Sequence, residues 1–182
     1  MKLIRIFTPE NSEDGIWSVH SDSAKRNEFA SFFKNINDIE YLREFFAKNA
    51  NDLDNNPWGT YTVEDAIIKT IEDAAEMEDT LEDCALQARR SNYYNLQHLF
   101  KPLNNFEYSI TVHQKSKARI KRSWLRLYAI RVDINCFVVT GGAIKLTLDM
   151  RRDYLQEELK KLEQTRIFLR ENNFDYPEDL KF

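Results

Sequence analysis

The pattern of residues 123–150 predicts two consecutive β-strands, and this segment constrains the fold of the chain more than any other. Side chains alternate between two faces over residues 124–132, and one of these faces carries both Arg126 and Tyr128. A short Asp-Ile-Asn turn leads into a second strand, which is expected over Cys136–Thr140 and to break at the adjacent glycines Gly141 and Gly142. Two glycines inside a strand pattern predict a bulge or a close approach of another group to the backbone. We therefore expect an antiparallel sheet at the centre of the fold.

The N-terminal part of the chain predicts a hairpin followed by helices. Two short strands are expected within residues 3–20, separated by a turn-forming Pro-Glu-Asn-Ser-Glu-Asp-Gly segment. Asp22 or Ser23 can cap a first amphipathic helix, and Asp38 can cap a second one. Residues 49–62 are rich in Asn and Asp and contain Pro and Gly, which indicates a loop.

The longest helix is predicted over residues 63–90, where Thr62 and Asp65 form a capping-box pattern. A further strand is expected over residues 106–112, and a last amphipathic helix runs from residue 153 to about residue 172. Together these elements predict an α+β fold, in which a small antiparallel β-sheet has N-terminal helices packed on it and a C-terminal helix.

Composition predicts one packed domain over residues 1–182. Hydrophobic residues make up 42% of the sequence, enough for a core, and Gly and Pro number only four each, which argues against long linkers. Cys84 and Cys136 lack any metal-binding spacing, so we expect buried reduced thiols and a cytoplasmic protein. No segment resembles a signal peptide or approaches the ~18 apolar residues needed to cross a bilayer, so no membrane association is expected.

Charge is distributed unevenly along the chain. Seven Lys or Arg and no acid lie between His113 and Val132, although the formal net charge of the protein is -4. A local concentration of positive charge on an acidic background predicts a site for a polyanion. Residues 64–83 contain nine acids and one Lys, and they form either a solvated helix surface or a docking surface for a basic partner.

The sequence lacks the common catalytic motifs. It contains no GxGxxG, P-loop, GxSxG or HExxH pattern, and its three histidines are too far apart to suggest a metal site, so no cofactor and no metal are expected. What remains is the basic and aromatic cluster around Arg126 and Tyr128. Such groups can promote metal-independent RNA cleavage by orienting the scissile dinucleotide, neutralising the phosphorane and transferring protons, and aromatic rings can stack on unpaired bases.

Each of these residues also has a structural explanation. Arg126 and Arg131 can pair with acids of the long helix. Tyr128 can pack within the sheet, His113 can be an ordinary loop residue, and residues 115–122 can form a solvated basic loop.

The order of these segments resembles a known family. A basic segment, a strand with the sequence WLRLYAI, a short turn, a strand with the sequence FVVTGGAIKLT and a helix entered through Tyr154 resemble the RelE/HigB group of toxins from bacterial toxin–antitoxin pairs. The resemblance covers roughly residues 99–172. It implies a RelE-like fold with an enlarged helical N-terminal half, and an mRNA endonuclease (mRNA interferase) that acts without a metal and inhibits translation.

The resemblance also implies roles for individual residues. Arg126 corresponds to the strand arginine that would hold the scissile phosphate. Lys145 corresponds to the cation after the last strand, and Tyr154 to the tyrosine of the final helix. Together with Lys117 these residues are the candidate catalytic set. Lys117 and Tyr154, or alternatively His113, would be the candidates for proton transfer. Six further residues are candidates for RNA binding: Lys115, Arg119, Lys121, Arg122, Tyr128 and His113.

The partners implied by the resemblance are mRNA, free or on the ribosome, and a cognate antitoxin protein of the helix-turn-helix type. A function of a different class remains open. The chain can instead be a non-catalytic module of the same fold, whose basic strands bind a protein or a nucleic acid without cutting it.

Overall fold

The computed structural model describes residues 1–87, 95–104 and 109–181, and it confirms the predicted α+β class. A six-stranded sheet has the order β1-β2-β6-β5-β4-β3. Neighbouring strands are antiparallel, except that β2 and β6 are parallel, so the sheet is mixed and not wholly antiparallel. The strands are β1 (Lys2–Phe7), β2 (Gly15–His20), β3 (Phe100–Pro102), β4 (Lys115–Ala118), β5 (Leu125–Asp133) and β6 (Cys136–Ile144).

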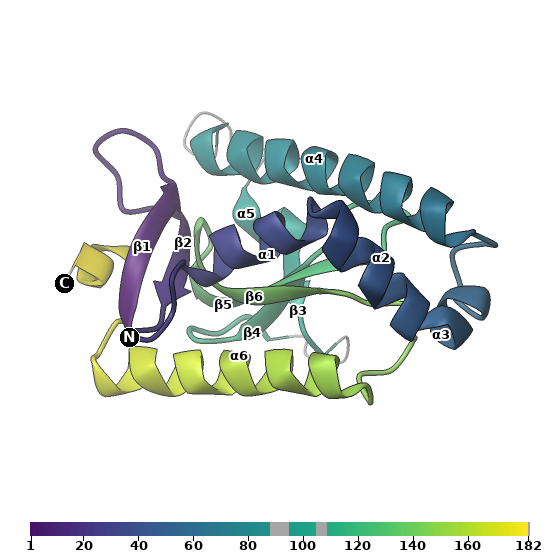
Figure 1. The fold of residues 1–182 in the computed structure, drawn as a ribbon. Helices are drawn as coiled ribbons and strands as arrows, with labels where there is room; N and C mark the ends of the chain where they lie inside the picture. The colour runs from purple at the N-terminus through teal and green to yellow at the C-terminus, as the bar shows by residue number, and fades with distance from the viewer. Residues whose placement is uncertain (88–94, 105–108, 182) are drawn as a thin grey trace.

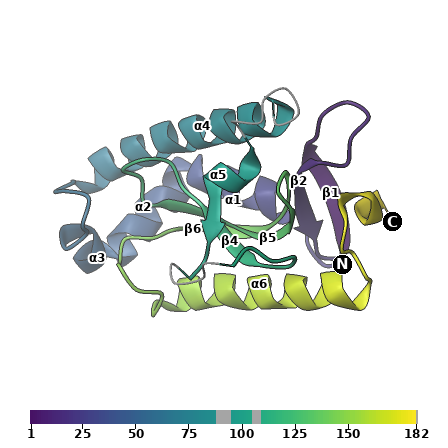
Figure 2. The same ribbon diagram turned by 180° about the vertical axis from the view of Figure 1, so that it is seen from behind.

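Helices cover both faces of the sheet (Figures 1 and 2). On one face lie α1 (Glu28–Ile36), α2 (Ile39–Lys48) and α4 (Val63–Gln87), and on the other lies α6 (Asp153–Glu171). The remaining helical segments are α3 (Ala50–Asp54), α5 (Leu96–Leu99) and the 3-10 turn η1 (Pro177–Lys181). None of the helices in the described part of the chain is long and apolar enough to cross a membrane.

Local capping explains where the N-terminal helices begin. The Asp38 carboxylate accepts hydrogen bonds from the first turn of α2, and Thr62 and Asp65 form the predicted reciprocal capping box of α4. The first helix begins later than expected, because Asn27, and neither Asp22 nor Ser23, accepts from the backbone of its first turn. The predicted end of α4, beyond Gln87, lies outside the described residues.

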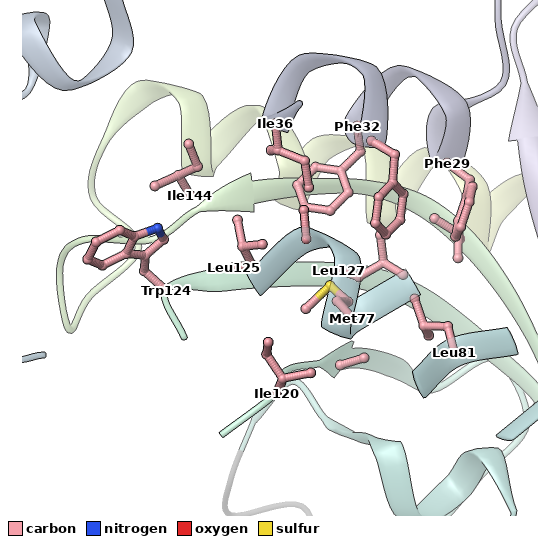
Figure 3. Close-up of a cluster of buried hydrophobic side chains, with 14 of the residues drawn as sticks. Phe29, Phe32, Ile36, Met77, Leu81, Ile120, Trp124, Leu125, Leu127 and Ile144 are labelled. Atoms are coloured by element: carbon pink, nitrogen blue, oxygen red, sulfur yellow. The ribbon is translucent and has the colours of Figure 1, made fainter. Parts of the chain in front are cut away.

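Alternation along β5 divides the core into two layers. Leu125 and Leu127 pack under α1, α2 and α4, together with Phe32 and Met77, in the cluster drawn in Figure 3. Tyr128 and its neighbours on the opposite face pack against α6. The predicted separation of the two strand faces is therefore confirmed.

Glycines let β6 continue past the point where the sequence suggested a break. The strand runs through Gly141 and Gly142 to Ile144, with a shift in its register to β5 at this point. Gly141 has a φ of 152°, and the carboxyl group of Glu158 occupies the position that a Cβ would take. A Cβ at Gly142 would lie 2.6 Å from the ring of Phe32, so both glycines permit the predicted close approach.

The strand predicted over residues 106–112 is wrong for its described part. Residues 109–112 form no strand, and residues 105–108 lie outside the described residues. The strand instead occupies Lys115–Ala118, within the segment 115–122 that was expected to form a basic loop. Backbone pairing with β5 on one side and β3 on the other outweighs the low strand propensity of Lys in this segment, and Ser116 and Ala118 are small enough to be buried. The expected loop over residues 49–62 contains the short helix α3.

Candidate functional site

Three adjacent strands place cationic side chains on the face of the sheet that α6 partly covers. Lys101 of β3 lies directly opposite Lys117 of β4, and Lys117 lies opposite Tyr128 of β5. Arg126 projects from the same face of β5, two residues before Tyr128. Like charges at directly opposed positions disfavour pairing of the strands, so this arrangement concentrates positive charge on one face of the sheet.

These side chains surround a cavity of about 920 Å³, which we name the cationic cavity. Trp58, from the loop before α4, and Thr147, Leu148 and Met150, which follow β6, form its walls. Leu159 of α6 lines one side. No carboxylate lines the cavity among the residues that the structure describes. Six cationic side chains line it: Lys101, Lys115, Lys117, Arg119, Arg126 and Lys145.

Arg126 is the most deeply placed of these cations, with 6% of its surface exposed. Its guanidinium donates to the carbonyl oxygens of Ser123 and Leu125, at 2.7 and 2.6 Å, and lies 5.7 Å from the centre of the Trp58 ring. No carboxylate of the described residues lies within ion-pair distance of it. Burial, and then the nearby Arg119, lower the pKa of Arg126 to about 10, so the side chain is charged at neutral pH. A buried charge without a counter-ion is costly, and an anion in the cavity would offset this cost.

Two lysines flank Arg126. The Lys145 ammonium donates to the carbonyl oxygens of Thr147 and Leu148, at 2.6 and 2.7 Å, and the Lys117 ammonium donates to the carbonyl oxygen of Leu103 at 2.9 Å. Burial is the main cause that lowers the pKa of both amines, and the charge of Arg126 adds to it. These lysines can exchange carbonyl oxygens for phosphate oxygens, and a lowered pKa makes an amine better suited to proton transfer.

The aromatic side chains differ in their access to the cavity. Tyr128 is 1% exposed and donates to the sulfur of Met150 at 3.6 Å. Its pKa is raised by burial, so it is a packed, protonated phenol and not an open stacking platform. Trp58 is only partly buried and lines the cavity, and it was not among the predicted site residues. The signal that could have identified Trp58 in the sequence is its position as a large aromatic residue between Pro57 and Gly59 in a predicted loop.

The structure gathers only part of the predicted RNA-binding set at the cavity. Lys115 lines the cavity and also pairs with Glu163 at 2.5 Å, and Arg119 lines it with an exposed side chain. Lys121 and Arg122 are exposed in the turn between β4 and β5 and do not line the cavity.

His113 and Tyr154 lie elsewhere. His113 is 5% exposed, and its ring Nε2 lies 2.9 Å from the carbonyl oxygen of Phe174, so the ring donates there. Tyr154, at the start of α6, packs edge-on against Phe45 at 5.3 Å between ring centres and lines a different cavity. Neither side chain is in position to transfer a proton at Arg126.

The long acidic helix does not neutralise the basic strands. It packs on the opposite face of the sheet (Figures 1 and 2), and Arg126 forms no ion pair with it. Arg131 donates to the side-chain oxygen of Gln97 at 2.6 Å and lies 3.7 Å from Asp133. The alternative in which both arginines pair with acids of this helix is therefore wrong.

Comparisons with known proteins identify no relative of this chain. No protein family matches it, and no curated protein or solved structure is significantly similar to it. The functional argument therefore rests on the cationic cavity itself.

Proposed function

We propose that the cationic cavity binds the phosphate backbone of single-stranded RNA and that the protein is a metal-independent RNA endonuclease of the RelE/HigB toxin type. The observation that carries the proposal is the group of six cations around Arg126 in a concave site that no described carboxylate lines. Phosphate contacts supply most of the affinity of proteins for nucleic acids. Trp58 and the exposed Leu148 provide apolar surface for bases beside the phosphates.

In the proposed reaction, the 2′-oxygen of one nucleotide attacks the adjacent phosphorus, and the bond to the 5′-oxygen of the next nucleotide breaks. The products are a 2′,3′-cyclic phosphate and a 5′-hydroxyl. Arg126 would hold the scissile phosphate and stabilise the charge of the transition state. Lys117 and Lys145 are the candidates for proton transfer, because burial lowers the pKa of both. As in the toxin group, we propose that an antitoxin encoded beside the chain silences it.

One observation favours a second candidate function. His113 and Tyr154, which were expected to assist proton transfer, do not line the cavity. A binding module that holds RNA without cutting it would need the cations and not these groups. Product analysis distinguishes the two candidates.

The test replaces the guanidinium with an apolar side chain of similar length, Arg126→Met. We expect RNA affinity to fall about ten- to hundredfold, because a charge-assisted contact to phosphate is lost. The slope of log affinity against log salt should become shallower by about 0.7. Binding is measured by fluorescence anisotropy with a labelled single-stranded RNA, and products are identified by mass spectrometry with EDTA present.

Arg170→Ala is the matched control, since it removes the same charge from an exposed position near the C-terminal end of α6. The free energy of unfolding of Arg126→Met should stay within about 2 kcal/mol of the wild-type value, because removal of a buried charge offsets the loss of its hydrogen bonds to the carbonyl oxygens of Ser123 and Leu125. Affinity and salt slope equal to those of the wild type would contradict the proposed site. Binding without a cyclic-phosphate product would support the non-catalytic alternative.

A further inference from the structure

An ion pair joins the two chain segments that carry the walls of the cationic cavity. Trp58 belongs to the segment that follows α3, and Leu148 belongs to the connection between β6 and α6. Asp52 of α3 and Arg152, the last residue of that connection, are 100 positions apart in the chain. The Arg152 guanidinium donates to both carboxylate oxygens of Asp52, at 2.6 and 2.5 Å. The two segments lie side by side in both views of the fold (Figures 1 and 2).

Hydrogen bonds couple the position of Trp58 to that of α3. The side-chain nitrogen of Asn56 donates to the carbonyl oxygen of Leu53 in α3, and its side-chain oxygen accepts from the Trp58 amide at 2.8 Å. Asn56 is 9% exposed, so these bonds are shielded from water. The Trp58 ring lies 5.7 Å from the Arg126 guanidinium. A displacement of α3 would therefore move this ring relative to Arg126.

The connection between β6 and α6 is bonded mainly to itself and to α6. Gln156 of α6 donates to the carbonyl oxygen of Met150, and Lys145 donates to two carbonyl oxygens of the same connection. These bonds do not reach α3. In the described part of the chain, the ion pair of Asp52 and Arg152 supplies the only hydrogen bonds between this connection and residues 49–62.

The sign of its charge excludes Asp52 from phosphate binding, because a carboxylate repels a polyanion. Neither Asp52 nor Arg152 lines the cavity. We propose that this ion pair positions the two walls of the cationic cavity: it holds Trp58 and Leu148 at a fixed separation, so that a base can stack beside the phosphate at Arg126. The inference rests on the proposed function, because it concerns the same site.

The test removes the carboxylate in Asp52→Ala, because attraction and positioning predict opposite results. If charge alone mattered, loss of a negative charge would tighten the binding of a polyanion. We expect RNA affinity to fall about five- to tenfold instead, because a displaced ring loses part of the stacking free energy. The slope of log affinity against log salt should stay within about 0.2 of the wild-type value, since no phosphate contact is lost. Affinity is measured by fluorescence anisotropy with a labelled single-stranded RNA.

Asp54→Ala is the matched control, because it removes an exposed carboxylate from the same helix. Its RNA affinity should equal or slightly exceed that of the wild type. Arg152→Lys keeps the positive charge and loses the paired donors of the guanidinium, so its affinity should fall about two- to fivefold at constant net charge. This variant also tests the proposal if urea unfolding shows that Asp52→Ala does not fold.

A double variant distinguishes positioning of Trp58 from a general structural role. The losses of Trp58→Ala and Asp52→Ala should not add when the two changes are combined, because both remove the same stacking surface. Additive losses would overturn the proposal. So would an Asp52→Ala affinity equal to or above the wild-type value, or a wild-type affinity of Arg152→Lys.

Arg126→Met separates this failure from failure of the proposed function. If the wild type binds RNA and Arg126→Met weakens binding, the RNA site stands and the Asp52 and Arg152 variants decide the positioning role alone. If the wild type does not bind RNA, or binds it independently of Arg126, both proposals are overturned.

Discussion

Replacing Glu158 by Gln should make the stability of the protein less dependent on pH. Glu158 lies between α6 and β6, with its carboxyl group against the backbone of Gly141. Burial is the main cause that raises its pKa from 4.5 to about 7; the ammonium of Lys161 opposes this rise, and the charge of Glu28 adds to it. The folded protein therefore keeps a proton that the unfolded chain releases at lower pH.

The sign and size of the effect follow from this difference. Below about pH 4.5 the carboxyl group is protonated in both states. Between pH 4.5 and about pH 7 only the unfolded chain loses the proton, so the free energy of unfolding falls as pH rises. At about 1.36 kcal/mol for each pH unit, this interval corresponds to about 3 kcal/mol. Gln does not titrate, so the Glu158→Gln variant should lack this loss.

The assay is urea unfolding followed by tryptophan fluorescence between about pH 4 and pH 8. Relative to the wild type, Glu158→Gln should gain about 3 kcal/mol on going from the acid to the alkaline end of this range. Glu157→Gln, at an exposed position paired with Lys160, should differ from the wild type by less than about 0.5 kcal/mol throughout. If the curves of the wild type and Glu158→Gln stay parallel across this range, the reasoning about burial is refuted.

Two further predictions concern packing. Gly142→Ala should lower the free energy of unfolding, measured in urea, by about 1–3 kcal/mol, because the new Cβ would lie 2.6 Å from the ring of Phe32. Adding Phe32→Leu should restore part of this loss. If the stability losses of the two single variants simply add in the double variant, the contact is not the cause. Cys84 and Cys136 should react slowly with a thiol reagent in the native protein and rapidly in urea, because both are buried and burial raises the pKa of both thiols; fast native labelling of Cys136 would contradict its burial.

Part of the arrangement of the cations was predictable, because the alternation of side chains along a strand depends only on residues that are neighbours in sequence. The alternation around Arg126 and Tyr128 correctly placed both on one face, and the two faces of β5 do form two separate layers of the core. The strand β4 lies directly beside β5, with Lys117 opposite Tyr128, so Lys117 and the nearby Arg119 line the same cavity as Arg126. Their roles in RNA binding stay predictions.

Other features depend on contacts between distant segments, which periodicity does not encode. Trp58 comes from a loop about seventy residues before Arg126 in the chain and reaches it only because that loop lies beside the sheet. Tyr154 shares a helix with residues near the cationic cavity, but the rotation of α6 on the sheet directs it to the separate cavity that Phe45 also lines. The His113 ring donates a hydrogen bond to the carbonyl oxygen of Phe174, close to the C-terminus, and does not line the cationic cavity.

The sequence by itself determined the elements whose signals are short-range: the N-terminal hairpin, the capping of α2 and α4, the alternation along β5 and the close approach at the two glycines of β6. Only the tertiary structure decided that Lys115–Ala118 is a strand, because its partners on both sides supply the backbone hydrogen bonds that Lys-rich segments do not favour alone. The tertiary structure also decided that β2 pairs with β6 in parallel and that this pairing ends at Val139 of β6. That early end leaves the edge of β6 beside the cavity that Tyr154 lines, since a strand ladder is set by which segments meet and not by the pattern of either one.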